Sequence, residues 1–205
     1  MEIQEENAFF WKMIEQSNKK INAPCEEYNI DEHIDYLTEL LSKVGKEKLI
    51  AFEKVFQKTM DKLYTAEIAE LSIIIENEYK NEEGKIVFKD YISTDGFIYF
   101  RCWLILKGKT FFDDITKDIN AFVNGKYSFN IGDTWAEGLI YVTNEANMKA
   151  NESVEEYEIT DFVREHFPEI MHYDLRTQDM NRAVKRGDEL QKMYPILVNE
   201  IIKIK

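Results

Sequence analysis

Glycine and proline are scarce in this chain, which has 8 and 3 of them among 205 residues. Both residues supply the tight turns that all-β folds need, so their scarcity argues against a fold of that class. The sequence is instead rich in leucine, isoleucine, glutamate and lysine, and 44% of it is hydrophobic, which favours amphipathic helices. We therefore predict an all-α fold, a multi-helix globular domain whose one expected departure from helix is a short β-hairpin insertion near residues 84–91.

Cysteine is rarer still, and the hydrophobic runs are short. Cys25 and Cys102 lie far apart, and Cys102 falls inside an apolar run, so we expect two reduced thiols rather than a disulfide scaffold. The longest apolar run, residues 97–106, is shorter than the ~20 residues of a membrane span and contains Arg101. The first residues are acidic and lack the apolar stretch of a signal peptide. These features predict a cytoplasmic protein that does not bind membranes.

Positive charge is in short supply. The chain has 26 lysines and arginines against 39 aspartates and glutamates, which gives a formal net charge of -13. Proteins that bind nucleic acid present a basic face to the phosphates, so we expect no nucleic-acid partner. The same charge argues against binding to anionic membranes. It favours a basic protein partner, because opposite charges steer the encounter of two proteins.

The sequence also lacks the motifs of common catalytic and cofactor sites. It contains no nucleophile elbow and no glycine-rich phosphate loop. Of the three histidines, His166 and His172 are six residues apart with Pro168 between them, which is not a zinc-binding spacing, and His33 falls at the edge of a helical stripe. We therefore assign no catalytic residue, no metal and no cofactor, and the balance of the sequence is against an enzyme.

Two charged clusters have simple structural interpretations. Asp113 and Asp114 are adjacent, and adjacent residues of a helix point about 100° apart, so the two carboxylates would not converge on one ion. A small basic cluster near the C-terminus contains Arg182, Lys185 and Arg186. In an acidic chain, internal ion pairs are the favoured role for this cluster.

The most unusual stretch is STDGFIYFRCWLILKG, residues 93–108. Ser93 is a good N-cap and Gly108 a good stop, so the stretch predicts a helix. Apolar side chains occur on every side of that helix, which indicates a central position in the core. Arg101 lies in the middle of the helix, and a buried charge is costly unless it is paired and hydrogen-bonded.

Two roles for Arg101 remain open. In the first, the guanidinium is held inside the protein, either by carbonyl groups at a helix end or by a carboxylate, for which the candidates are Asp95, Glu67, Glu70 and Glu137. In the second, it faces a cavity and binds the carboxylate or phosphate of a small molecule. The candidate ligand-binding residues are then Asp95, Tyr99, Arg101 and Trp103.

Two segments of the chain follow a pattern shared with a known family. Phe10 and Trp11 match a Phe-Trp pair near the start of that pattern. Residues 93–108 match S-D-D-G-F-x-Y-F-R-x-W-L-I-x-x-G except at Thr94, where the pattern has an aspartate. On these residues, the chain over residues 8 to 150 resembles the DUF4240 family of uncharacterised bacterial proteins. The resemblance implies a shared fold and a common motif, without an activity.

We therefore expect two parts: residues 1–150 as a helical DUF4240-like domain, and residues 151–205 as a C-terminal helical extension packed on it. Within the extension, residues 178–205 are predicted to be helical with a break at Pro195. The favoured function is a non-enzymatic protein-binding module, such as an immunity-like or regulatory protein that binds a basic partner. The alternative is a small-molecule-anion binding protein or a hydrolytic enzyme with its site around Asp95, Tyr99, Arg101 and Trp103. The sequence does not indicate an oligomeric state.

Overall fold

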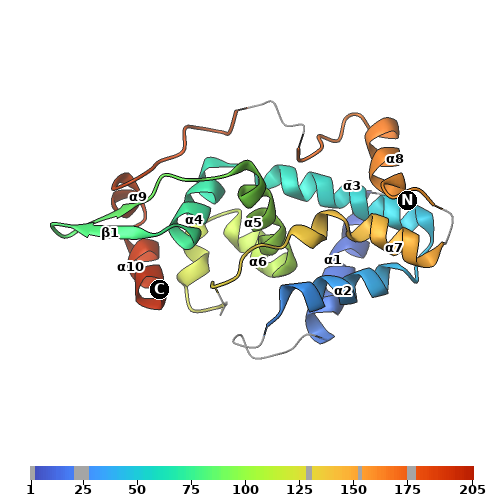
Figure 1. Ribbon diagram of the computed structural model, residues 1–205, viewed down its shortest axis with the longest axis horizontal. Helices are drawn as coiled ribbons and strands as arrows, with labels where there is room; N and C mark the ends of the chain where they lie inside the picture. The colour runs from blue at the N-terminus through green and yellow to red at the C-terminus, as the bar shows by residue number, and fades with distance from the viewer. Residues whose placement is uncertain (1–2, 21–27, 128–130, 152–153, 175–178) are drawn as a thin grey trace.

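The computed structural model describes residues 3–20, 28–127, 131–151, 154–174 and 179–205. Within these ranges the chain forms ten α-helices, two short 3₁₀ helices and one two-stranded hairpin (Figure 1). The predicted all-α class with a hairpin insertion is therefore confirmed. Cys25 lies outside the described residues, whereas Cys102 is a free thiol buried in the core.

Four helices form the first part of the chain: α1 (Ile3–Lys20), α2 (Ile30–Leu41), α3 (Lys46–Lys62) and α4 (Ala66–Glu76). Polar caps set two of the starts, because Asn29 accepts a hydrogen bond from the first turn of α2 and Thr65 does the same for α4. α1 packs against α3, and the ring of Phe10 lies 4.6 Å from that of Phe52. α4 is buried along nearly its whole length, which explains its continuous apolar sequence.

The hairpin follows α4 and consists of β1 (Tyr79–Glu82) and β2 (Lys85–Phe88), with Tyr79 opposite Phe88. Its turn is made by Glu83 and Gly84, which both have positive φ angles. Figure 1 shows the hairpin at one end of the elongated molecule, beside α9 and α10. The buried side chains of β2, Ile86 and Phe88, attach the hairpin to the rest of the protein.

The helix predicted at residues 93–108 is α5 (Thr94–Leu106), and it lies in the middle of the molecule (Figure 1). Ser93 caps it by accepting a hydrogen bond from the amide of Gly96, and it contacts α3, α4 and α6. The chain then turns at Gly108, whose φ of 93° is one that glycine adopts without strain. A Cβ at Gly108 would lie 2.8 Å from the carboxylate end of the Glu15 side chain, which can move, so the φ angle is the main reason for a glycine at this turn.

Four shorter elements follow: α6 (Lys109–Ile115), η2 (Ile119–Val123), η3 (Glu137–Ile140) and α7 (Val142–Ala150). α7 packs against α2 and α3, and η3 packs against α5. A main-chain hydrogen bond from the amide of Ala136 to the carbonyl of Tyr99 joins the segment before η3 to α5. This bond places the neighbouring side chains of the two segments on one surface.

The last part of the chain contains α8 (Glu158–His166), α9 (Glu189–Met193) and α10 (Pro195–Ile204). α8 packs on α3 and α7 at one end of the molecule, and α10 packs on α4 and η2 near the other end (Figure 1). The prediction of a helix over residues 178–205 with a break at Pro195 is confirmed at the end of the chain, where α9 ends at Met193 and α10 begins at Pro195, and it is wrong for residues 179–188. Residue 178 lies outside the described residues, residues 179–188 are irregular, and Pro195 begins a helix, because the first helical position needs no amide hydrogen.

In the described part of the chain, no helix combines the length and the apolar character that a bilayer crossing requires.

Candidate functional site

Arg101, the residue on which two roles were left open, is held by main-chain oxygens. Only 1% of it is exposed. Its Nε donates to the carbonyl of Phe97 at 3.2 Å, and its Nη1 donates to the carbonyl of Met60, in the last turn of α3, at 3.0 Å. The rings of Tyr64 and Phe97 lie 5.3 and 4.8 Å from the guanidinium carbon. The helix-end carbonyl alternative is therefore the correct one.

The carboxylate partners predicted for Arg101 are used elsewhere or stay at the surface. Glu67 and Glu70 contact Arg182, Glu137 accepts from Tyr99, and Asp95 is exposed at the start of α5. Burial lowers the pKa of Arg101 to about 10, so the guanidinium stays charged at neutral pH. The side chain fastens α5 to the end of α3, which is a structural role.

Trp103 is also a core residue. It is fully buried, its ring lies 5.6 Å from that of Phe100 and 6.1 Å from that of Phe122, and the ammonium of Lys107 lies 4.8 Å from it. The structure thus divides the four predicted site residues into two pairs. Arg101 and Trp103 are in the interior, whereas Asp95 is exposed and Tyr99 half-buried at the surface.

The surface around Tyr99 combines aromatic side chains with carboxylates that accept hydrogen bonds from them. The hydroxyl of Tyr99 donates to Glu137 at 2.8 Å, and its ring lies 6.0 Å from that of Trp135. Trp135 is 60% exposed, yet its indole nitrogen donates to Glu76 at 3.1 Å. The hydrogen bond to Glu76 and the contact with the ring of Tyr99 fix the orientation of the Trp135 ring, which is exposed to solvent.

Gly96, in the shared motif, contributes to the same surface. A Cβ at this position would lie 2.6 Å from the Oγ of Ser93, which caps α5, and 3.9 Å from the ring of Trp135. The absence of a side chain at Gly96 therefore leaves room for the capping hydroxyl of Ser93, while the ring of Trp135 lies at ordinary contact distance. This arrangement gives the Ser-x-Asp-Gly part of the motif a local structural reason.

Carboxylates surround these aromatic side chains. The hydrogen bond to Glu137 is the main cause that raises the pKa of Tyr99 to about 12, and burial and the charge of Asp95 add to it. Burial raises the pKa of Tyr141, and the charges of Glu137, Asp95 and Glu145 raise it further. Among the described residues, Asp95, Glu137 and Glu145 form no ion pair. We call this surface the acidic aromatic face; it consists of Asp95, Tyr99, Trp135, Glu137, Tyr141 and Glu145.

Two adjoining hollows continue the acidic aromatic face toward α8. The nearer, of about 180 Å³, lies beside Tyr141, Glu145 and Met148. The second, of about 270 Å³, lies between α7, α8 and the segment after α8. Tyr141, Asn144 and Tyr157 line both hollows, so the two are neighbours.

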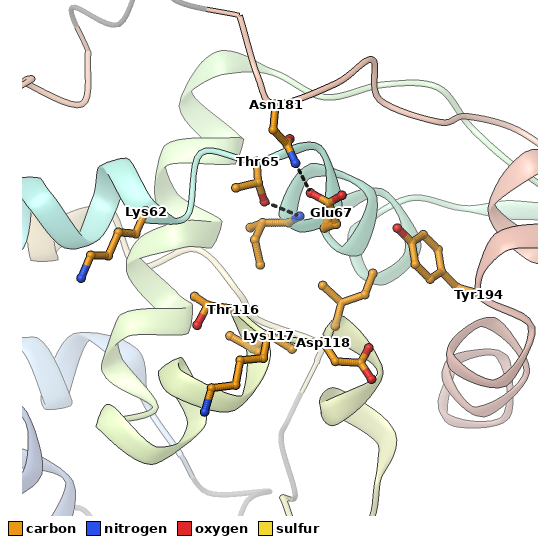
Figure 2. A pocket seen from close by; sticks show the side chains of 11 residues that line it. Lys62, Thr65, Glu67, Thr116, Lys117, Asp118, Asn181 and Tyr194 are labelled. Carbon is orange, nitrogen blue, oxygen red and sulfur yellow. Dashed lines mark hydrogen bonds between the residues drawn. The ribbon is translucent and has the colours of Figure 1, made fainter.

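A larger cavity, of about 360 Å³, lies on another part of the molecule, between the start of α4, the loop before η2 and the C-terminal segment (Figure 2). Its polar side chains already have internal partners: Thr65 caps α4, Asn181 contacts Glu67 and the amide of Ala66, and Asp118 caps η2. The ammonium ends of Lys62 and Lys117 point away from Glu67 and Tyr194 in Figure 2. This cavity therefore offers fewer groups for a ligand than its size suggests.

A buried charge network lies beside that cavity. The carboxylate of Glu70, which is fully buried, accepts hydrogen bonds from Arg182, from the hydroxyl of Tyr194 at 2.6 Å and from the amide of Lys185 at 2.6 Å. Arg182 also donates to Glu67 at 3.0 Å. The predicted internal ion pairs are confirmed for Arg182 and for Lys185, which pairs with Glu189, whereas Arg186 donates to the main-chain carbonyl of Asp90. The network attaches the C-terminal segment to α4.

The histidines differ in their surroundings. His33 is buried, and its two ring nitrogens contact Ser17 and the hydroxyl of Tyr28, each at 2.8 Å. His166 stacks on Phe162, while His172 lines the second hollow. Within the described ranges, no three histidine, cysteine or acidic side chains converge as they would around a metal ion.

The fold and the face together define a mostly helical protein with a capped central helix and an acidic, aromatic surface. The chain belongs to the DUF4240 family, described as a protein of unknown function, whose pattern matches residues 6–149. This match confirms the resemblance over residues 8 to 150. A search of curated proteins found no match, and a search of solved structures found none either.

Proposed function

We propose that this protein is a non-enzymatic protein-binding module, immunity-like or regulatory in kind, which binds a basic partner through the acidic aromatic face. The observation that carries the proposal is the grouping of Trp135, Tyr99 and Tyr141 with the carboxylates of Asp95 and Glu145, which lack a cation among the described residues. The net charge of -13 also supports the proposal, because it attracts a basic protein over long distances.

The chemistry of the face suits lysine and arginine side chains. Tyrosine and tryptophan are the residues most often found at energetic centres of protein interfaces, and their rings attract cations. Carboxylates beside the rings add charge-assisted hydrogen bonds. Since Glu76 and Tyr99 already fix the ring of Trp135, binding would cost little side-chain entropy there.

The alternative, a small-molecule-anion binding protein or hydrolytic enzyme around Asp95, Tyr99, Arg101 and Trp103, has less support. Its anion-holding group, Arg101, donates to two carbonyls in the core. The surface pair, Asp95 and Tyr99, lies among carboxylates that would repel an anion. The geometry therefore favours the binding module.

Affinity capture from the cells that make the protein tests the proposal. Wild-type protein should enrich a basic protein, and Trp135→Ala or the double variant Asp95→Asn/Glu145→Gln should reduce its recovery by about tenfold. The matched control is Glu82→Gln/Glu83→Gln, which makes the same change of charge at the exposed tip of the hairpin and should leave recovery unchanged.

Circular dichroism of each variant establishes that the fold is intact. The proposal is wrong if no basic protein is recovered with the wild type. It is also wrong if the variants of the acidic aromatic face recover as much partner as the hairpin control does.

A further inference from the structure

The second hollow beside the acidic aromatic face has the features of a site for a planar cation. It measures about 270 Å³, and the rings of Tyr141 and Tyr157 form part of its wall. Two carboxylates, those of Asp161 in α8 and Asp174 in the segment after it, also line it. Glu145 and Glu156 line the adjoining hollow, so the potential at the entrance is negative.

Among the described residues that line the hollow, Arg164 supplies a guanidinium, and it is loosely held. Arg164 lies 3.9 Å from Asp161 and 3.8 Å from Asp174, which exceeds the ~2.8 Å of a charge-assisted hydrogen bond. Nearly half of its side chain is exposed to solvent. Exposed ion pairs at such distances contribute little free energy, so another guanidinium can replace Arg164 between the two carboxylates at small cost.

His172 gives an independent indication of a missing donor. Only 6% of it is exposed, and its Nδ1 contacts the carboxylate of Asp174. A carboxylate accepts a hydrogen bond from Nδ1–H, which leaves Nε2 of the neutral ring as an acceptor. Among the described residues this buried nitrogen has no hydrogen-bond partner, which is unfavourable for a polar atom in the interior. His172 lines the hollow, so a donor bound there would be close to this nitrogen.

We propose that this hollow binds the side chain of one arginine of the basic partner. The guanidinium lies between Asp161 and Asp174, its plane stacks on Tyr141 and Tyr157, and one of its N–H groups donates to His172. The inference rests on the proposed function for the class of partner, and it adds a defined subsite outside the acidic aromatic face. Lysine fits less well, because an ammonium cannot contact two carboxylates in one plane.

Titration with N-acetyl-arginine amide, followed by the amide NMR spectrum of the full-length protein, tests the subsite. Saturable shifts should appear at residues 141–144, 157–164 and 170–174, with a dissociation constant in the millimolar range. N-acetyl-citrulline amide has nearly the same shape without the charge, and should bind at least about tenfold more weakly.

Three variants sharpen the test. Asp174→Asn and Asp161→Asn should each weaken arginine amide binding by about fivefold to tenfold, since each removes one carboxylate of the clamp. Arg164→Gln should strengthen binding severalfold, because it removes the competing internal cation, an outcome that a purely structural Arg164 would not produce. Asp113→Asn, which pairs with Lys109 in α6, is the control and should have no effect.

Absence of saturable shifts, equal binding of citrulline amide, or unchanged binding in both aspartate variants would overturn the subsite. These results would leave the proposed function standing if the partner were still captured through Trp135. Conversely, arginine amide binding without capture of any basic protein would retain the subsite and remove the proposed partner.

Discussion

Arg101 shows at the scale of a single residue how a buried charge can serve a fold without an ion pair. Its guanidinium satisfies a carbonyl in the last turn of α3, which has no partner within its own helix, and lies against two aromatic rings. Arg101→Ala should therefore lower the free energy of unfolding by about 3–5 kcal/mol, through the cavity and the unsatisfied carbonyl. Urea unfolding followed by circular dichroism measures this change.

Arg101→Lys keeps the charge but loses the planar fork, so an intermediate loss is expected, of about 1–3 kcal/mol. At a temperature where both variants are folded, their binding through the acidic aromatic face should equal that of the wild type. A selective loss of binding in folded Arg101→Lys would show that the residue acts in recognition after all.

His33 makes a second prediction at the residue scale. Burial, with a smaller contribution from the charge of Lys107, lowers the pKa of His33 to about 4 from its usual 6.5. A histidine whose pKa is lower in the folded state favours folding in its neutral form. Its contribution is complete above pH 6.5 and is lost as the pH falls from 6.5 to 4, by about 3 kcal/mol in total.

Unfolding free energies measured between pH 7 and pH 4 test this prediction, with His33→Gln as the comparison. The variant should be less stable at pH 7, where it lacks the contacts to Ser17 and Tyr28, and should lose less stability on acidification. Parallel pH profiles for the two proteins would contradict the assignment.

The C-terminal segment carries the main prediction at the scale of elements. Residues 179–188, which we call the C-terminal strap, are irregular and are attached chiefly by Arg182 to the buried carboxylate of Glu70. Arg182→Gln should cost about 3 kcal/mol, because it leaves a buried charge without its cation. Hydrogen exchange should then rise in the strap and α9 while α5 stays protected.

Glu70→Gln combined with Arg182→Gln is the control for this prediction. The double variant removes both charges and should recover part of the lost stability. If the strap exchanges no faster in Arg182→Gln than in the wild type, the attachment depends on other contacts, such as those of α10.

Elements with strong local signals could be predicted from the sequence, and elements fixed by distant contacts could not. α5 carries both a cap and a continuous apolar pattern, and it was predicted close to its observed position. The strap contains helix-forming residues but is irregular. Its residues Asn181 and Arg182 form hydrogen bonds with Ala66 and Glu67 of α4, and these distant contacts outweigh the local preference for helix. The hairpin was predicted from a turn at Glu83 and Gly84 and from the β-like residues 85–88, so its second strand was placed better than its first.

The candidate site was predictable only in part for the same reason. Asp95 and Tyr99 stand out in the motif, but Trp135 joins them through a hydrogen bond to Glu76, 59 positions away. The sequence pattern around Trp135 gives no sign of that contact. The sequence did offer one signal for Trp135. A large apolar side chain that is exposed at the surface often marks a binding site, and Trp135 lies in a polar stretch of the chain.

At the scale of the whole molecule, the excess of acidic residues predicts binding that depends on salt. Raising the sodium chloride concentration from about 50 to about 500 mM should weaken binding of the captured partner by at least tenfold, mainly through slower association. Surface plasmon resonance separates the association and dissociation rates. An association rate that does not change with salt would mean that apolar contact alone drives the encounter.

The family pattern covers residues 6–149, whereas the arginine subsite takes most of its lining from residues 157–174. Most of the proposed subsite therefore lies outside the part of the chain that the family pattern covers. The two surfaces adjoin at Tyr141, so a change in the extension can alter partner choice without altering the shared part of the fold.

The position of the strap also bears on how the protein would respond to mechanical tension. The described chain begins near α8 and ends near the hairpin, at opposite ends of the long axis (Figure 1). A pull on the two ends would load α10 before the contact of Arg182 with Glu70, because α10 lies between that contact and the C-terminal end. Under tension, the C-terminal part should therefore detach in order, first α10, then α9 and then the strap.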